Sequence, residues 1–258
     1  MPRILKQFLY GAFFLLIFGG IIWGAYLWFV KPAPSCSDGI QNQGEQGIDC
    51  GGPCANVCIP SDIKPIGATG QLQIFHSTPT GISILVQVQN PNSAYAADRF
   101  SYTFKIYDNQ NVLLSEITDE SFVYGSEIKY LGAFNLPFPN ANRIELFIGT
   151  PEWVPADSFK KPALVVQNVQ TASTASGLQA NGRFVNNDSV ALGKVTALSI
   201  FYDASGKPAG ISKNEVTDVL PGETRTFSVM HPLFLNPDLS RTAVFLYGKR
   251  PVLPGGTR

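Results

Sequence analysis

The chain of 258 residues carries 19 basic and 19 acidic residues, so its formal net charge at neutral pH is zero. Its basic residues are scattered, whereas nucleic-acid-binding proteins gather Lys and Arg on one face or element. Only two histidines occur, His76 and His231, and the chain has no phosphate-binding loop, G-x-S-x-G elbow or H-E-x-x-H pattern. These features predict a protein that is not an enzyme, binds no nucleic acid and has no small-molecule substrate.

An apolar segment near the N-terminus has no charged residue between Lys6 and Lys31. Its 23 residues from Phe8 to Val30 would extend about 35 Å as a helix, and a bilayer core is about 30 Å thick. Aromatic residues typical of membrane interfaces stand near its ends, at Tyr10, Trp23, Tyr26 and Trp28. We therefore expect one transmembrane helix that holds the protein in the lipid bilayer.

The charges on the two sides of this segment predict its orientation. Arg3 and Lys6 precede it, whereas Lys31 alone follows it and acidic residues come next. The positive-inside rule then places the N-terminus in the cytoplasm and the C-terminal body outside. We expect a single-pass protein of the cell membrane with an extracytoplasmic body. Cleavage is the alternative, because Ala33-Pro34-Ser35 loosely matches a small-x-small site, but we favour retention of the anchor.

All four cysteines lie in the short segment "CSDGIQNQGEQGIDCGGPCANVC", at Cys36, Cys50, Cys54 and Cys58. In an oxidising space outside the membrane, an even number of cysteines predicts disulfides, and four cysteines allow three pairings. A zinc site is less favoured, since the later gaps are C-x-x-x-C and no histidine is near. A redox site would also use C-x-x-C. We call residues 32–60 the collar and expect two disulfides there, with the pairing open.

Acidic and amide side chains recur between the first two cysteines, with glycines among them: Asp38, Asn42, Glu45 and Asp49. Oxygen ligands on a flexible loop are what calcium binds, although the spacing is not that of an EF-hand. The alternative is a solvated acidic turn, and we favour it. Calcium is thus the one cofactor that the sequence suggests, through these four residues.

The order of residues in the collar, C-x-D-G-I-x-N-x-G-E-x-G-I-D-C-G-G-P-C, resembles a short motif of bacterial cell-surface proteins. The resemblance covers under a tenth of the chain. It implies a secreted or surface location and bound calcium, and it implies no reaction.

The remainder of the chain alternates β-type runs with turn residues and shows no sustained helical periodicity. The runs that we expect to be strands are 82–90, 99–108, 128–136, 143–149, 163–169, 178–187, 194–203, 224–231 and 242–248. We therefore predict an all-β fold, with two tandem immunoglobulin-like β-sandwiches after one transmembrane helix and a small Cys-rich segment. The expected boundaries are 1–31 for the tail and helix, 32–60 for the collar, and 61–157 and 158–258 for the sandwiches.

The two sandwiches are predicted to be copies, because their sequences match at an offset near 96 residues. Asn90 aligns with Asn186, and "YGSE" (124–127) aligns with "LPGE" (220–223). About 95 residues with about seven strands per copy is the size of an immunoglobulin-like domain. Residues 61–160 carry a net charge of −4 and residues 161–258 carry +4. This difference indicates either head-to-tail contact between molecules or drift between copies, and we favour drift.

A second resemblance rests on Phe104, Ile106, Tyr107 and Asp108, which resemble the F-x-[LI]-Y-D pattern of the FxLYD domains of bacterial envelope proteins. The second copy keeps Phe201, Tyr202 and Asp203 but has Ser199 at the first position. Both copies are also similar to late-embryogenesis-type immunoglobulin-like sandwiches. These resemblances imply a fold more than a function.

Two functional classes follow from these features. The first is a non-catalytic, membrane-anchored protein of the cell surface whose sandwiches serve as a spacer and a protein-interaction module, with an unknown protein partner. The alternative is an accessory subunit of a membrane secretion, pilus or transport complex. Glycines of the apolar segment, such as Gly20 and Gly24, favour helix packing in that second case.

Overall fold

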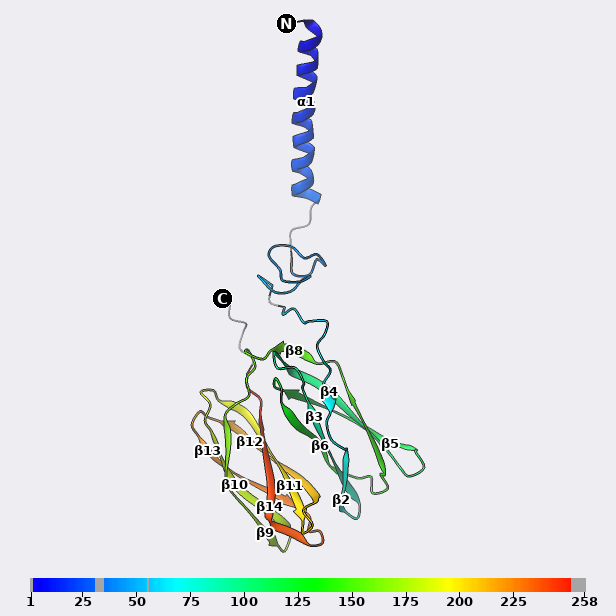
Figure 1. Cartoon of the computed structure of the whole chain (residues 1–258), viewed down its shortest axis with the longest axis vertical. Coiled ribbons are helices and arrows are strands. Elements are labelled where there is room, and N and C mark those ends of the chain that lie inside the picture. Colours follow the sequence, from blue (N-terminus) through cyan, green and yellow to red (C-terminus); the bar gives the residue numbers. More distant parts are fainter. Residues whose placement is uncertain (1, 31–34, 55, 252–258) are drawn as a thin grey trace. The chain divides into compact units, whose positions relative to one another are not determined.

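The computed structural model describes residues 2–30, 35–54 and 56–251 and contains two compact units, Met1–Cys58 and Ile59–Arg258. The first unit holds the helix and the four cysteines of the collar, and the second holds every described strand (Figure 1). The prediction of an all-β fold with a single N-terminal helix is confirmed. Ala33 and Pro34 of the possible cleavage site, and Lys31 beside it, lie outside the described residues.

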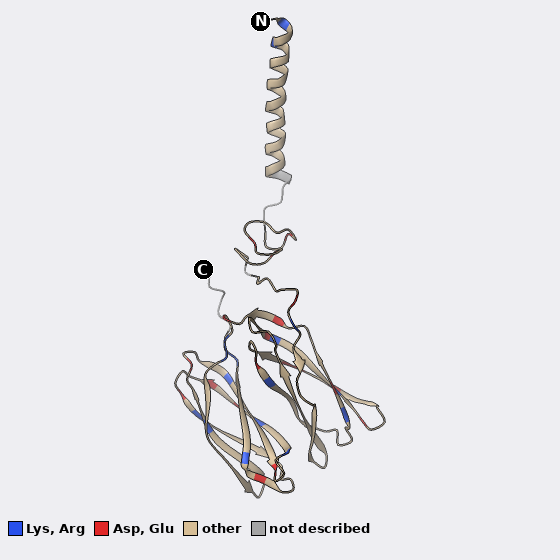
Figure 2. Cartoon of the chain, in the orientation of Figure 1, with Lys and Arg blue, Asp and Glu red and all other residues tan. Residues whose placement is uncertain are grey.

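Helix α1 (Arg3–Ala25) continues into a π-helical turn, η1 (Tyr26–Val30). None of the α1 side chains is buried, so the apolar surface of this helix has no packing partner among the described residues. Figure 2 shows its basic residues, Arg3 and Lys6, near the N-terminal end only. By length and composition the helix is able to cross a membrane or to act as a signal sequence.

The first sandwich consists of two antiparallel sheets. In one sheet β3 pairs with β1, β2 and β6, and in the other β4 pairs with β5, β7 and β8. The strands are β1 (Gly67–Ala68), β2 (Gln73–Thr78), β3 (Gly81–Gln89), β4 (Tyr95–Tyr107), β5 (Leu113–Val123), β6 (Ile128–Leu136), β7 (Arg143–Ile148) and β8 (Glu152–Pro155).

The second sandwich has the sheet orders β13-β10-β9 and β12-β11-β14. Its strands are β9 (Leu164–Thr174), β10 (Gly177–Asn186), β11 (Leu192–Asp203), β12 (Pro208–Val219), β13 (Thr224–His231) and β14 (Pro237–Gly248). The described strands thus number eight and six, where about seven per copy were predicted. The difference arises from the short strands β1 and β8, which pair at the edges of the first sandwich only.

Each sandwich has its own core, formed where side chains of alternate residues meet between its two sheets. In the first, β3 contributes Ile82, Ile84, Val86 and Val88 to a cluster that includes Phe100 and Phe104 of β4. In the second, Phe184, Phe201 and Phe227 belong to the equivalent cluster. Alternation toward a buried face is therefore what places these apolar runs in strands.

A third apolar cluster lies between the two sandwiches. Leu85 of β3 and Phe75 of β2 pack there with Leu198 and Ile200 of β11 and Ile211 of β12. The sheet that carries β3 and β6 therefore faces the sheet that carries β11 and β12, as Figure 1 also shows. Strands β3 and β11 are consequently buried on both faces, whereas an isolated sandwich would expose one face of each sheet to solvent.

The repeat predicted from the sequence is visible in the turns that follow β4 and β11. The Asp108 carboxylate accepts hydrogen bonds from the backbone N–H groups of residues 110 and 112, at 2.8 and 2.9 Å. Asp203 accepts the same bonds from residues 205 and 207, at 2.9 and 3.0 Å. In both turns the residue three positions later has a positive φ, at Asn111 (62°) and Gly206 (79°). The aligned aspartates thus hold equivalent turns.

Candidate functional site

The collar contains two disulfides, which join Cys36 to Cys54 and Cys50 to Cys58. The first cysteine therefore pairs with the third and the second with the fourth, a choice that the spacing left open. No free cysteine occurs among the described residues. Because the cysteine sulfurs are bonded to one another, the collar offers no thiolate ligand for zinc, and it contains no reduced redox pair.

The acidic residues of the collar hold its backbone together. Asp49 accepts hydrogen bonds from the N–H groups of Asp38 and Gly39, each at 2.9 Å. Glu45, which is buried, accepts from the N–H groups of Asn42 and Asp49 at 3.2 and 3.3 Å. Asp38 accepts from the Asn42 side-chain amide at 2.9 Å, and this bond is the main cause that lowers the pKa of Asp38.

The structure therefore brings together the four residues that the sequence suggested for calcium, but it gives their carboxylates other partners. Among these side chains, the oxygen without a hydrogen-bond partner is Asn42 Oδ1, which is buried. Glu45 also lies beside the Cys36–Cys54 sulfurs, but a disulfide is a poor ligand in comparison with a thiolate. Hydrogen bonds and the two disulfides together hold the loop.

The residues of the F-x-[LI]-Y-D pattern divide between core and surface. Phe104, Ile106 and Phe201 are buried in the sandwiches, and Ser199, which replaces the aromatic residue in the second copy, is buried as well. Tyr107 and Tyr202 each lie under a guanidinium group, from Arg143 and Arg241, at 4.0 and 4.5 Å from the ring centroids. With the aspartate turns already described, every residue of the pattern has a structural role.

The two histidines lie in different surroundings. His76 is exposed, whereas His231 is buried and stacks on Phe201 at a centroid distance of 5.3 Å. His231 Nδ1 lies 3.1 Å from the Ile211 carbonyl oxygen and 3.0 Å from Ser212 Oγ. We infer that Nδ1 carries a hydrogen and donates a hydrogen bond to the carbonyl oxygen, so it does not serve as a base for the serine. Burial lowers the pKa of His231 to about 4.

Polar contacts join the sandwiches beside their shared apolar cluster. Lys249 pairs with Asp98 at 3.0 Å, and Lys161 pairs with the buried Glu127 at 2.8 Å. In both pairs the base comes from the positive half of the chain and the acid from the negative half. Part of the opposite charge of the two halves therefore lies in ion pairs within the molecule.

The segment between the sandwiches is also fixed in place. Phe159, which the predicted boundary assigns to the second domain, is fully buried against Tyr124 of the first sandwich, with ring centroids 4.6 Å apart. The Tyr124 hydroxyl donates to the Gly248 carbonyl oxygen at 2.8 Å and accepts from the N–H of Arg250 at 3.1 Å. The connection is therefore a packed joint.

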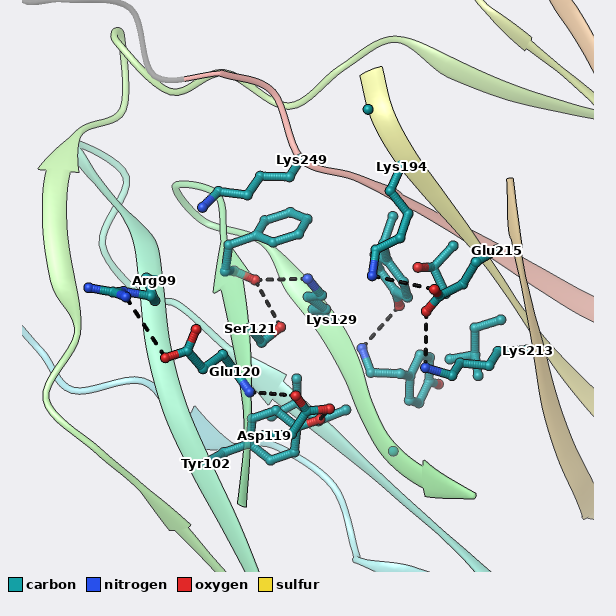
Figure 3. Close-up of a pocket in the computed structure, with 18 of the residues that line it drawn as sticks. Arg99, Tyr102, Asp119, Glu120, Ser121, Lys129, Lys194, Lys213, Glu215 and Lys249 are labelled. Carbon is teal, nitrogen blue, oxygen red and sulfur yellow. Dashed lines mark hydrogen bonds and ion pairs between the residues drawn. The ribbon is translucent and has the colours of Figure 1, made fainter. Parts of the chain in front are cut away.

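A cleft of about 890 Å³ lies where β5 and β6 of the first sandwich meet β11 and β12 of the second (Figure 3). The walls combine aromatic and aliphatic side chains with ten charged residues. The apolar wall residues are Tyr102, Phe122, Tyr130, Leu131, Phe134, Leu198 and Tyr247. A volume of this size suits a small ligand or a short peptide segment.

Most charged side chains that line the cleft are in ion pairs. Glu215 pairs with Lys194 at 3.4 Å and with Lys213 at 3.1 Å. Arg99 pairs with Glu152 and with Glu120, and the second of these distances is 3.9 Å. The remaining pairs are Lys249 with Asp98 and Arg250 with Asp188. Tyr102 donates a hydrogen bond to Asp119 at 3.4 Å, and burial raises the pKa of this tyrosine.

Lys129 differs from these residues. It belongs to β6 and is only 4 % exposed, and its ammonium lies 3.4 Å from the ring centroid of Phe122 and 4.9 Å from that of Tyr247. Its Nζ donates to the Phe122 carbonyl oxygen at 2.9 Å. Burial lowers the pKa of Lys129 to about 7. We did not identify this residue from the sequence. The feature that could have indicated it is that Lys129 occupies a core-facing position in the alternating run "IKYLGAFNL".

Comparison with known proteins adds little. No family model matches the chain, and no curated protein matches it. Among the solved structures that match is the crystal structure of a red sea bream transglutaminase, at 18 % sequence identity and a TM-score of 0.21. The match covers 69 % of this chain and 29 % of the transglutaminase chain. A likeness of this size carries no argument about fold or activity.

Proposed function

We propose that the protein is a non-catalytic, membrane-anchored module of the cell surface or envelope. Helix α1 is its single-pass anchor with a cytoplasmic N-terminus. The body outside acts as a spacer and as a protein-interaction module. The proposal agrees with the resemblance to cell-surface and FxLYD-type domains that the sequence carries.

The observation that carries this proposal is the combination of an unpartnered apolar helix with two disulfides in the segment that follows it. An apolar helix without buried side chains needs a lipid environment. Disulfides form and persist outside the cytoplasm. Together these features support one orientation, and the basic residues Arg3 and Lys6 before the helix support the same one.

The direct experiment is protease digestion of intact cells, of cells with the envelope opened, and of lysed cells. We expect the β body to be digested once the protease reaches the outer face of the membrane, while a tag on the N-terminus stays protected until lysis. Protection of the body after the envelope is opened would contradict the proposal. A protein that runs shorter than the full chain would indicate that the helix is removed as a signal sequence.

Calcium binding by the collar stays a prediction. It would involve Asp38, Asn42, Glu45 and Asp49, of which Asn42 Oδ1 has no hydrogen-bond partner. Titration of the protein with calcium, before and after reduction of the disulfides, tests it. Binding that disappears on reduction supports a site built by the collar. An absence of binding before reduction supports the acidic turn.

The alternative function is an accessory subunit of a membrane secretion, pilus or transport complex. It is favoured by the small residues Gly20 and Gly24 of α1, where a β-carbon would meet no atom within 4 Å. Extraction in mild detergent followed by co-purification separates the two functions. A stable membrane complex that dissociates in the Gly20→Leu, Gly24→Leu variant would support the alternative.

A further inference from the structure

The cleft between the sandwiches contains one buried cation whose hydrogen-bonding capacity is largely unused. A lysine ammonium has three N–H donors. Among the described residues, Lys129 Nζ has one hydrogen-bond acceptor, the Phe122 carbonyl oxygen. The aromatic rings of Phe122 and Tyr247 stabilise its charge from two sides. Two donors of a side chain that is 4 % exposed are thus without an oxygen partner within the described structure.

The other basic residues of the cleft differ from Lys129 in their ion pairing. Every other basic side chain that lines the cleft has a carboxylate within 4 Å, whereas Lys129 has none among the described residues. Glu127, the acid whose charge acts on Lys129, is paired with Lys161 and also accepts the N–H of Tyr124 at 3.0 Å. Burial of an ammonium without an anion is costly, which is the reason that its pKa falls to about 7.

We propose that this cleft binds an organic carboxylate with an apolar body, whose carboxylate group pairs with the Lys129 ammonium. The bound anion supplies the oxygen partners that the free side chain lacks. A single unpaired cation suits a monoanion better than a phosphate, which would recruit several basic groups. The site goes beyond the proposed surface function and does not depend on the orientation of the anchor.

The walls of the cleft fit the remainder of such a ligand. Phe122 and Tyr247 lie beside the ammonium, and Tyr102, Leu131 and Phe134 line the same space. An apolar body against these walls gains hydrophobic stabilisation, while its carboxylate gains strength from the low-dielectric surroundings. Both the free carboxylic acid of a small molecule and the C-terminus of a polypeptide have this chemistry.

The test uses the full chain in detergent micelles and two pairs of probes. The first pair is 3-phenylpropionate and its neutral amide. The second pair is a short apolar peptide with a free C-terminus and the same peptide with an amidated C-terminus. Binding of each probe is measured by isothermal titration calorimetry at pH 6.5, where Lys129 carries its charge.

The key variant is Lys129→Met, which keeps the aliphatic stem and removes the charge. Its matched control is Lys105→Met, because Lys105 lies outside the cleft and pairs with Glu116 at 2.9 Å. Both variants keep the anchor, so uptake of a probe into the micelle is the same in each sample. Thermal melting shows that both are folded.

We expect at least one carboxylate probe to bind the unmodified chain and the Lys105→Met variant with equal affinity. Its amide, and the Lys129→Met variant, should give binding weaker by about tenfold or more, since a charge-assisted pair is lost. Preference for the small probe or for the peptide identifies the source of the ligand. The proposal is overturned if neither carboxylate binds, if the amides bind as well, or if Lys129→Met binds as tightly as the unmodified chain.

Discussion

Asn90 and Asn186, which are 96 positions apart, make the same hydrogen bonds in the two sandwiches. Each is fully buried, and each carboxamide oxygen accepts the N–H of the residue two positions later, at 3.0 and 3.1 Å. Each amide nitrogen donates to carbonyl oxygens of two separate segments, which for Asn90 are those of Tyr95 and Tyr124. The two asparagines thus tie the end of one strand to two other parts of the chain.

Replacement of either asparagine by alanine should lower the free energy of unfolding by about 1–3 kcal/mol, because buried carbonyl groups lose their donors. Asn187→Ala is the matched control, since Asn187 is exposed and next to Asn186, and it should change the stability by less than about 0.5 kcal/mol. Chemical denaturation measures all three variants. Equal changes in the free energy of unfolding for Asn186→Ala and Asn187→Ala would show that the buried hydrogen bonds do not contribute to stability.

His231 should make the protein sensitive to mild acid. Its pKa in the folded protein is about 4, below the ordinary value of 6.5, so the unfolded chain takes up a proton first as the pH falls. The contribution of this residue to stability is therefore complete above pH 6.5 and decreases toward pH 4, by about 2–3 kcal/mol in total. Denaturation at pH 7.0 and 4.5 should show a smaller decrease for His231→Gln than for the unmodified chain. His76→Gln, at an exposed site, should retain the full decrease.

Lys129 should make the free energy of unfolding depend on pH in the neutral to alkaline range. Because burial lowers its pKa from 10.5 to about 7, the unfolded state binds more protons than the folded state between these values. The free energy of unfolding should therefore rise with pH across this window, by about 2–4 kcal/mol, and the titration of Lys129 should not change it further below pH 7. The Lys129→Met variant should lose that rise, and Lys105→Met should keep it. Denaturation at pH 7.0 and 9.5 gives the comparison; parallel curves for all three proteins would contradict it.

Ser199 should be replaceable with a gain in stability. It is fully buried at the position that Phe104 occupies in the first copy, and its hydroxyl has no hydrogen-bond partner among the described residues. Ser199→Ala should raise the free energy of unfolding by about 1 kcal/mol, because an unsatisfied hydroxyl is removed from an apolar core. Ser212→Ala, whose hydroxyl contacts His231, should not stabilise the protein. A loss of stability in Ser199→Ala would indicate that the hydroxyl has a partner after all.

The strands that the sequence identified are those with strong apolar alternation. The predicted runs 128–136 and 224–231 coincide with β6 and β13, residue for residue. Strand β5 was missed because six of its eleven residues are exposed, and β12 was missed because polar residues such as Lys213, Asn214 and Glu215 interrupt its apolar pattern. The structure confirms the alignment of Asn90 with Asn186 and of Asp108 with Asp203. These alignments could be made from sequence because each of these side chains bonds to backbone groups only a few residues away.

The contact between the sandwiches could not be derived from alternation alone. "ISILV" in β3 and "ALSIF" in β11 are each apolar except for one serine and are buried at all five positions, which is the pattern of a strand buried on both faces. The sequence indicates that such a strand is covered, but it does not name the covering element. The cleft and Lys129 depend on that packing, so neither was predictable. The disulfide pairing was hidden for a similar reason, since it follows from the three-dimensional path of the collar.

The central claim of this account is that the collar and the β body lie outside the cytoplasm. The measurement that tests it most directly is mass spectrometry of the protein taken from its own cells, with free thiols alkylated before lysis and the disulfides left intact. We predict peptides that join Cys36 to Cys54 and Cys50 to Cys58, and no alkylated cysteine. Four alkylated cysteines in the unreduced protein would contradict the orientation, the oxidising location and the proposed surface function together.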